Sequence, residues 1–233
     1  MKGAKKNNNR HNLLVSLGFN IVIPSIIMIM FDDWFGISPA LALVLALLFP
    51  VGYGGLDLIR TRKWNLFSSV GFFSVFVTGG IGLFQLPREW IAIKEASVPI
   101  IFFAFIVISS FGERTFLEKL LLDEDILNAD LVYDRLQTAE KKAKLHKIML
   151  HASVILALSF ALSAVLNFLL AKAVVHSEGG SVEFTKELGR MVALSYPIIV
   201  LPCTVVLYCM LHYVVKKLEH LTELTANELL DLG

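Results

Sequence analysis

The sequence predicts an all-α protein, a polytopic membrane helix bundle with six transmembrane helices and a cytoplasmic amphipathic helical segment between the fourth and fifth. Hydrophobic residues make up 56% of the chain and charged residues 18%, whereas soluble domains have about 45–50% apolar and about 25% charged residues. The charges are also uneven, because residues 113–147 hold 15 of the 41. The rest of the chain consists of apolar runs near the roughly 20 residues that a helix needs to cross a bilayer.

The first apolar run, residues 13–31, is longer than the roughly 7–15 residues of a signal-peptide core. It follows a basic tail, residues 1–12, and ends at Asp32, Asp33 and Trp34 instead of a small-residue cleavage site. We therefore interpret it as a span with Trp34 at the membrane interface. The six predicted spans are residues 13–31, 37–58 (with a helix start at Ser38-Pro39), 66–86, 90–111, 148–175 and 191–215.

The distribution of basic residues predicts that both termini are cytoplasmic. With this orientation the inner side carries 16 of the 21 lysines and arginines, in agreement with the positive-inside rule. The five on the outer side are Arg88, Lys94, Lys172, Lys186 and Arg190. The resulting organisation is a cytoplasmic tail (1–12), a four-span unit (13–111), a cytoplasmic amphipathic segment (112–147), a two-span hairpin (148–215) and a cytoplasmic tail (216–233) that reads as a short amphipathic helix.

The four-span unit contains an internal similarity. The pattern that begins at Asn12 recurs from Asn65 as Asn-Leu-x-x-Ser-x-Gly-Phe, at an offset of 53 residues. Parallel repeats of this kind occur in some transporters. The alternative is chance similarity between two membrane-entry sequences, which use few residue types.

Residues 113–147 combine leucines at near-helical spacing with acidic residues that give way to four lysines. One interpretation is a set of helices at the inner membrane surface, with the basic end against anionic lipid. A partner-docking helix and a solvated linker with one amphipathic face are the alternatives.

The turn between spans 3 and 4 is the stretch where we expect a working site. Its first part is rich in glycine (Gly79, Gly80, Gly82), and four charges follow within eight residues: Arg88, Glu89, Lys94 and Glu95. The apolar run after Glu95 is short for a span, so we expect the helix to begin near Trp90 and to place Lys94 about one turn inside. Because a lysine facing lipid is costly, we expect it to face the Gly79–Gln85 end of span 3, with a carboxylate or helix-end carbonyls as its partner. Among the carboxylates, Glu89, Asp32 or Asp33 is the more plausible partner.

Small and polar residues also recur at helical spacing inside the spans. On span 3 they are Gly71, Ser74, Thr78, Gly82 and Gln85, and Asn20 and Asn167 belong to similar stripes on spans 1 and 5. Such faces either pack against another helix or line a polar interior. Three ionisable residues lie toward the inner ends: Asp57, one turn before Arg60 and predicted to pair with it at the interface, and His151 and His212, both predicted to be interfacial.

The sequence contains no enzyme signature. A nucleophile elbow, a His-Glu-x-x-His motif and a phosphate loop are all missing. Cys203 and Cys209 lie six residues apart in one apolar run, so they point in different directions on a helix and are predicted to be free thiols. We expect neither a catalytic site nor a metal or cofactor, and the net charge of +1 argues against nucleic acid as a partner.

The chain resembles a widespread family of bacterial inner-membrane proteins of uncharacterised function, commonly labelled by a Vibrio locus tag. The residues that carry the resemblance are Phe49-Pro-x-Gly-Tyr53, Thr78-Gly-Gly-Ile-Gly82, Trp90-x-x-x-Lys94-Glu-Ala96, Glu187-Leu-Gly-Arg-Met191 and Ser195-Tyr-Pro197. The chain is more distantly similar to intracellular septation protein A, at Gly79-Gly80, Leu83-Phe84, Ile91 and Lys94. That family is linked to cell-envelope maintenance and division, and the extra span pair and residues 113–147 are departures from it.

Two classes of function remain open at this point. The first is a non-enzymatic inner-membrane protein that acts in the cell envelope through membrane partners or lipids, with a homo-oligomer as one form of partnership. The second is a small-solute or ion transporter or channel. For both, the candidate functional residues are Asn20, Asp57, Thr78, Gly79, Gly80, Gly82, Gln85, Arg88, Glu89, Lys94, Glu95, Asn167 and Arg190.

Overall fold

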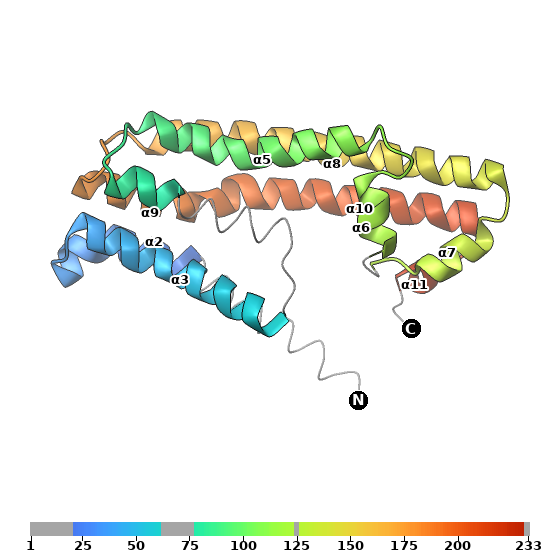
Figure 1. Cartoon of the computed structure of the whole chain (residues 1–233), viewed down its shortest axis with the longest axis horizontal. Helices are drawn as coiled ribbons and strands as arrows, with labels where there is room; N and C mark the ends of the chain where they lie inside the picture. Colours follow the sequence, from blue (N-terminus) through green and yellow to red (C-terminus); the bar gives the residue numbers. More distant parts are fainter. Residues whose placement is uncertain (1–20, 62–76, 124–125, 231–233) are drawn as a thin grey trace. The chain divides into compact units, whose positions relative to one another are not determined.

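The computed structural model describes residues 21–61, 77–123 and 126–230, and every regular element in these ranges is helical (Figure 1). The elements in chain order are α2 (Ile23–Met30), the π-helical turn η2 (Phe31–Phe35), α3 (Pro39–Thr61), a helical stretch at 77–83, α5 (Glu89–Ser109), α6 (Phe116–Asp123), α7 (Ala129–Arg135), α8 (Ala139–Val174), α9 (Val182–Ser195), the π-helical turn η3 (Tyr196–Val200), α10 (Leu201–Thr222) and α11 (Ala226–Leu229).

Three helical segments among the described residues are long and apolar enough to cross a membrane: Glu89–Ser109, Ala139–Val174 and Val182–Thr222. They correspond to the predicted spans 4, 5 and 6. Span 2 corresponds to α3, whose apolar part, Pro39–Gly52, is shorter. The first part of each of predicted spans 1 and 3 falls in residues 1–20 and 62–76, which lie outside the described residues.

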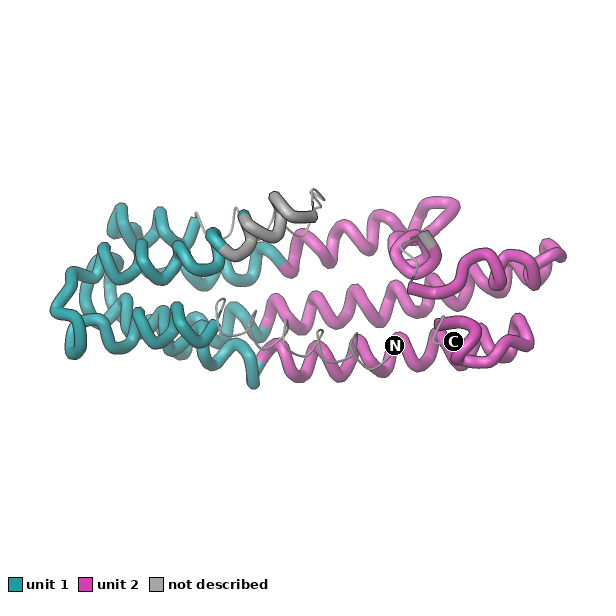
Figure 2. Tube along the Cα trace, turned by 90° about the horizontal axis from the view of Figure 1, so that it is seen from below, with its two compact units in different colours: residues 1–98, 166–198 teal, residues 99–165, 199–233 magenta. Residues whose placement is uncertain are grey.

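The chain forms two compact units, one of residues 1–98 with 166–198 and the other of residues 99–165 with 199–233 (Figure 2). In unit 1, α2 packs against both α3 and α9. Gly189 permits the close approach of α9 to α2, because a Cβ at this position would lie 2.8 Å from Met28 Cβ and 3.0 Å from the Ser25 carbonyl oxygen. Small residues are the usual means by which membrane helices approach so closely.

The helix that contains predicted span 6 begins before residue 191. The helix starts at Val182, where Ser181 accepts a hydrogen bond from the Phe184 backbone N–H at 3.1 Å. Its first turns bury Phe184 and Leu188. These turns are amphipathic rather than uniformly apolar, so hydropathy alone did not include them in the predicted span.

Unit 2 has a continuous apolar core to which the segment 113–147 contributes. Leu117, Leu121, Leu127 and Leu136 are buried in it. Glu118 is also buried, and its carboxylate accepts a hydrogen bond from Arg114 Nε at 3.1 Å. These four leucines therefore pack against protein, whereas Leu131 is 37% exposed, and a location of the segment at the membrane surface stays a prediction.

The C-terminal tail is not one amphipathic helix. Instead α10 continues to Thr222 and ends at Glu223, which has a left-handed φ of 61°. The short α11 then begins with a capping box formed by Thr225 and Glu228. It buries Leu229, and the carbonyl of that residue accepts a hydrogen bond from the Asn128 backbone N–H at 2.8 Å, which attaches the tail to the start of α7.

Candidate functional site

The turn between the helical stretch 77–83 and α5 closes as a Schellman motif. The backbone N–H of Leu86 donates to the Ile81 carbonyl at 2.9 Å, and that of Gln85 donates to the Gly82 carbonyl at 3.4 Å. Gln85 occupies the left-handed position with φ of 53°, a conformation that costs a non-glycine residue about 1–2 kcal/mol. Tertiary contacts must therefore stabilise Gln85 in this conformation.

Those contacts come from the loop between α8 and α9. A Cβ on Gly179 would lie 2.9 Å from the Leu86 carbonyl oxygen, and a Cβ on Gly180 would lie 2.7 Å from Gln85 Cγ. Gly180 also has a φ of 86°, which side chains rarely permit. The two glycines thus provide the space into which the turn fits, and Arg88 adds a hydrogen bond from its guanidinium to the His176 carbonyl.

The same loop is held from α9 by the Glu187 carboxylate. It accepts hydrogen bonds from the backbone N–H groups of His176 and Ser177, both at 2.9 Å. Lys186, the preceding residue, forms ion pairs with Asp33 at 3.3 Å and Asp32 at 3.7 Å. Polar contacts therefore join the turn before α5 to the α8–α9 loop, and join α9 both to that loop and to η2.

The glycine-rich face of span 3 packs against protein, as the packing interpretation expects. At Gly82 a Cβ would overlap Leu43 Cδ2 of α3 and lie 3.5 Å from Phe184 Cε1 of α9. At Gly79 a Cβ would lie 3.1 Å from Leu47 Cδ1. A larger side chain at either position requires the side chain of Leu43 or Leu47 to shift, whereas Gly71 and Ser74 lie outside the described residues.

The prediction that α5 begins near Trp90 and turns Lys94 inward is confirmed. The helix begins at Glu89, and the Lys94 side chain is only 10% exposed. Its predicted partner is wrong, because Lys94 Nζ lies 2.7 Å from Oε1 of the adjacent Glu95. Adjacent side chains on a helix diverge by about 100°, but both of these are long enough to bend toward each other.

The acidic residues predicted as partners of Lys94 are engaged elsewhere. Asp32 and Asp33 pair with Lys186, and Glu89 lies 3.4 Å from Arg88 Nε at an exposed position. The pair of Lys94 and Glu95 is more buried than any of these, since the Glu95 side chain is 22% exposed. It is a charged pair inside a helix bundle, the kind of feature that in a membrane protein marks a functional site.

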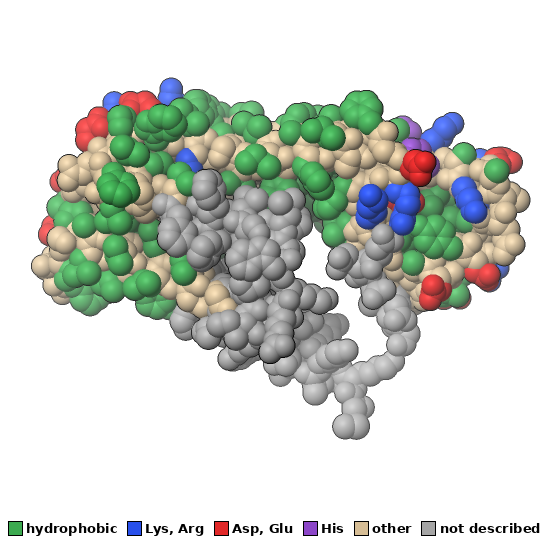
Figure 3. Space-filling model, viewed as in Figure 1, with side chains coloured by type: hydrophobic (Ala, Val, Ile, Leu, Met, Phe, Trp, Pro, Cys, Tyr) green, Lys and Arg blue, Asp and Glu red, His purple; other side chains and the backbone are tan. Residues whose placement is uncertain are grey.

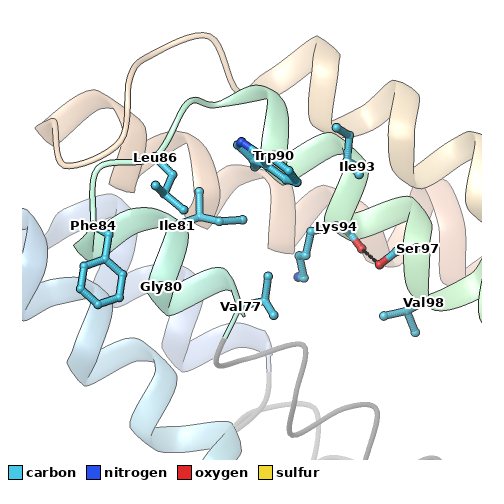
Figure 4. A pocket seen from close by; sticks show the side chains of 10 residues that line it. All are labelled: Val77, Gly80, Ile81, Phe84, Leu86, Trp90, Ile93, Lys94, Ser97 and Val98. Carbon is cyan, nitrogen blue, oxygen red and sulfur yellow. Dashed lines mark hydrogen bonds between the residues drawn. The ribbon is translucent and has the colours of Figure 1, made fainter.

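Lys94 lines a groove of about 450 Å³ in unit 1. The other lining residues are Val77, Gly80, Ile81, Phe84, Leu86, Trp90, Ile93, Ser97 and Val98, all labelled in Figure 4. Lys94 is the charged residue among these ten, and its side chain extends from α5 toward the part of the groove that Val77 lines (Figure 4). The Ser97 hydroxyl donates to the Lys94 carbonyl at 2.7 Å, so this hydroxyl supports the backbone of α5. As far as the described residues line it, the groove is thus apolar with one ammonium group.

Two smaller cavities adjoin the same ion pair. One, of about 190 Å³, is lined by both Lys94 and Glu95, with Thr78 and residues of α2, α3 and α9. The other, of about 90 Å³, is lined by Glu95, Asn167 and Ser195 among others. Lys94 therefore borders the groove and one cavity, and Glu95 borders both cavities.

The exposed surface of α5 is largely apolar. Trp90 and Ile93 are 53% and 52% exposed, and Ile100, Ile101 and Ile108 are also exposed. Figure 3 shows hydrophobic side chains covering much of the visible face, with charged side chains near the loops of unit 1 and, in unit 2, around α6 and α7. Such a surface fits contact with lipid acyl chains.

The structure brings together some of the predicted site residues and not others. Thr78, Gly80, Lys94, Glu95 and Asn167 border the groove or its adjoining cavities. Gly79 and Gly82 provide close packing, Gln85 and Arg88 join the turn to the α8–α9 loop, and Glu89 and Arg190 are exposed. Asn20 and the side chain of Asp57 lie outside the described part of the chain, as does the proposed pair of Asp57 with Arg60.

Sequence reasoning missed four contributors to this region: Gly179, Gly180, Lys186 and Glu187. The signal for the first two was a Gly-Gly pair in a predicted outer turn. Lys186 and Glu187 lie on the first turns of α9, after the N-cap residue Ser181. Charged residues at such positions are usually interpreted as a solvent-exposed helix face. Their partners are 10 or more residues away in sequence, so no local pattern could identify them.

Within the described residues, no three His, Cys, Asp or Glu side chains come together as a metal site, and both cysteines are free. No family model matches the chain, and no curated protein and no solved structure matches it either. The resemblance to the inner-membrane family therefore stays an expectation, and the geometry of unit 1 is the basis for the function proposed below.

Proposed function

We propose that this protein is a non-enzymatic, multi-pass protein of the bacterial inner membrane that contributes to cell-envelope maintenance by binding a membrane lipid in unit 1. In this proposal the chain has six spans and cytoplasmic termini, as the distribution of lysine and arginine favours. The three long apolar helices suggest a membrane-embedded protein.

The observation that carries the proposal is the groove of about 450 Å³ between the helical stretch 77–83 and α5. Among the described residues, its lining is apolar except for Lys94 and Ser97. Trp90 lies at the groove, and tryptophan is enriched where membrane meets water. A ligand with a long apolar part and a small polar head fits this lining, and the bilayer supplies such ligands.

The test is to fill the groove without disturbing the helices. A Cβ on Gly80 would meet only Phe84 Cδ2, at 3.9 Å, which is an ordinary contact. Gly80→Leu should therefore be tolerated and should occupy the groove. The matched control is Gly52→Leu, on the exposed side of α3, where a Cβ meets nothing within 4 Å.

Native mass spectrometry of the purified full chain provides the measurement. The wild-type protein and Gly52→Leu should retain a stoichiometric lipid after extensive detergent exchange, and Gly80→Leu should lose it. Equal lipid retention by all three proteins, or none in the wild type, would refute lipid binding in this groove.

A second candidate is transport of a small solute or ion. It is favoured by one observation, the position of the buried Lys94–Glu95 pair beside two further cavities with polar lining at Thr78, Asn167 and Ser195. Reconstituted vesicles test it with pH-sensitive and ion-sensitive dyes. Transport predicts a flux that Glu95→Gln abolishes, and a flux equal to that of protein-free vesicles would exclude the ions tested.

A further inference from the structure

We infer that the groove selects lipids with an anionic headgroup, that Lys94 binds the anion, and that Glu95 is the counter-ion which the lipid displaces. This inference rests on the proposed lipid binding and adds the chemical class of the ligand and the way in which it engages the site. The groove, the lysine and its present partner all belong to unit 1.

Charge complementarity indicates the class of ligand. Lys94 carries the charge among the ten residues of the groove lining, and Glu95 borders the smaller cavities rather than the groove. A head that enters the groove therefore meets a cation and apolar side chains. An anionic head is attracted there, whereas a neutral or cationic head forms no ion pair with the ammonium, which then keeps Glu95 as its partner.

The depth of Lys94 indicates a lipid of the bilayer rather than a soluble anion. Trp90 is half exposed at the start of α5 and suits the level of the headgroups. Lys94 follows four residues later, about 6 Å farther along the helix. The ammonium is thus expected just below the headgroup level, where a lipid phosphate reaches it while the acyl chain lies along Ile81 and Val98.

The pairing of Lys94 with its neighbour explains why the counter-ion is displaceable. The side chains of adjacent helical residues do not face each other, so the 2.7 Å contact requires both long side chains to bend and to lose rotamer freedom. An ammonium has three donors, and a phosphate that approaches from the groove offers several acceptor oxygens without this requirement. Replacement of one anion by another also avoids leaving a buried lysine unpaired, which is strongly destabilising.

A site for the released carboxylate adjoins the pair. Glu95 already lines the cavity of about 90 Å³ that Asn167 and Ser195 also line. A side-chain rotation into this cavity separates the Glu95 carboxylate from the incoming phosphate. The cavity is therefore the space that exchange of the counter-ion requires.

The experiment compares lipids that share their acyl chains and differ in their heads: phosphatidylglycerol, phosphatidylcholine and diacylglycerol. Each is titrated onto the full-length protein in detergent and followed by native mass spectrometry. The wild type should bind phosphatidylglycerol about tenfold more tightly than the other two, as expected for charge-assisted hydrogen bonds. Lys94→Arg should keep this preference, and Glu95→Gln should keep or increase it because the competing anion is gone.

The decisive variant replaces both charges, Lys94→Met with Glu95→Gln, so that no uncompensated charge stays in the unit. It should bind all three lipids with equal affinity, and its elution volume and melting temperature should equal those of the wild type. Lys186→Met, which removes a cation that does not line the groove, is the matched control and should behave as the wild type.

A phosphatidylglycerol preference that survives in the double variant, or that also disappears in Lys186→Met, overturns the inference. Tight lipid binding with no headgroup preference in the wild type overturns it too and leaves the proposed function standing. No lipid binding at all, or a second copy of the chain in place of lipid, overturns both.

Discussion

Gln85 and Gly180 are in direct contact although 95 residues separate them: a Cβ on Gly180 would lie 2.7 Å from Gln85 Cγ. Both residues have left-handed backbones, with φ of 53° and 86°. The turn that leads into α5 and the loop that leads into α9 are therefore fitted to each other. Because α5 carries Lys94, this contact supports the start of the helix that lines the groove.

The first prediction concerns this contact. Gly180→Ala should destabilise the protein by about 2 kcal/mol, because alanine disfavours a positive φ and its Cβ would collide with Gln85. Thermal denaturation in detergent is the measurement. Gly55→Ala is the control, since a Cβ there meets nothing within 4 Å inside α3 and alanine raises helix propensity. Equal melting temperatures for the Gly180 variant and the wild type would contradict the fitted contact.

The second prediction concerns the packing of the glycine face. Gly82→Leu should destabilise the protein by about 1–3 kcal/mol, as overpacking does, because its Cβ would overlap Leu43 Cδ2. Gly82→Ala should cost less stability in a Leu43→Ala background than in the wild type, since Leu43→Ala removes the colliding atom. A double variant whose losses simply add would show that the two residues are not in contact.

The third prediction concerns the pH dependence of the C-terminal cap. Hydrogen bonds from the backbone N–H and the hydroxyl of Thr225 lower the pKa of Glu228, and the charge of Arg135 lowers it further. Because the pKa of Glu228 is lower in the folded state, its carboxylate stabilises the folded cap fully at any pH above the ordinary glutamate pKa. This stabilising effect is lost as the pH falls through the lowered pKa.

Amide exchange of α11 measures this effect. Protection of the Leu229 and Leu230 amides, which donate to Thr225 and Ala226 carbonyls, should be constant near neutral pH after correction for intrinsic exchange, and should fall in acid. Glu228→Gln should remove the acid-dependent step. Protection that is independent of pH down to full protonation of carboxylates would contradict the prediction.

The fourth prediction concerns the orientation in the membrane. Glu178 and Lys142 are exposed residues of a predicted outer turn and of the predicted inner segment. After replacement of Cys203 and Cys209 by serine, Glu178→Cys should react with an impermeant thiol reagent in intact cells. Lys142→Cys should react only after the membrane is opened. The reverse labelling pattern would invert the predicted topology.

Some parts of the site could be predicted because they depend on local rules. The short apolar run after Glu95 predicted a helix start near Trp90 and an inward Lys94, since the thickness of the bilayer and the penalty for a lipid-facing charge act on any sequence. The glycine spacing predicted that Gly82 packs against other helices for a similar reason. The partner of Lys94 escaped prediction because it depends on which of several nearby carboxylates is already engaged, and Lys186 takes Asp32 and Asp33.

The sequence by itself determined the all-helical class, the apolar helices and the free cysteines, because hydropathy and helical periodicity are properties of short segments. Only the tertiary structure decided that Gly179 and Gly180 pack against the turn at Gln85. It also decided that the Glu187 carboxylate accepts hydrogen bonds from the loop before α9, and that the segment 113–147 buries leucines in unit 2. Each of these depends on a contact between residues distant in sequence. The physical reason is that close packing and the pairing of buried charges are settled by shape and by competition among neighbours in space, and a linear pattern records neither.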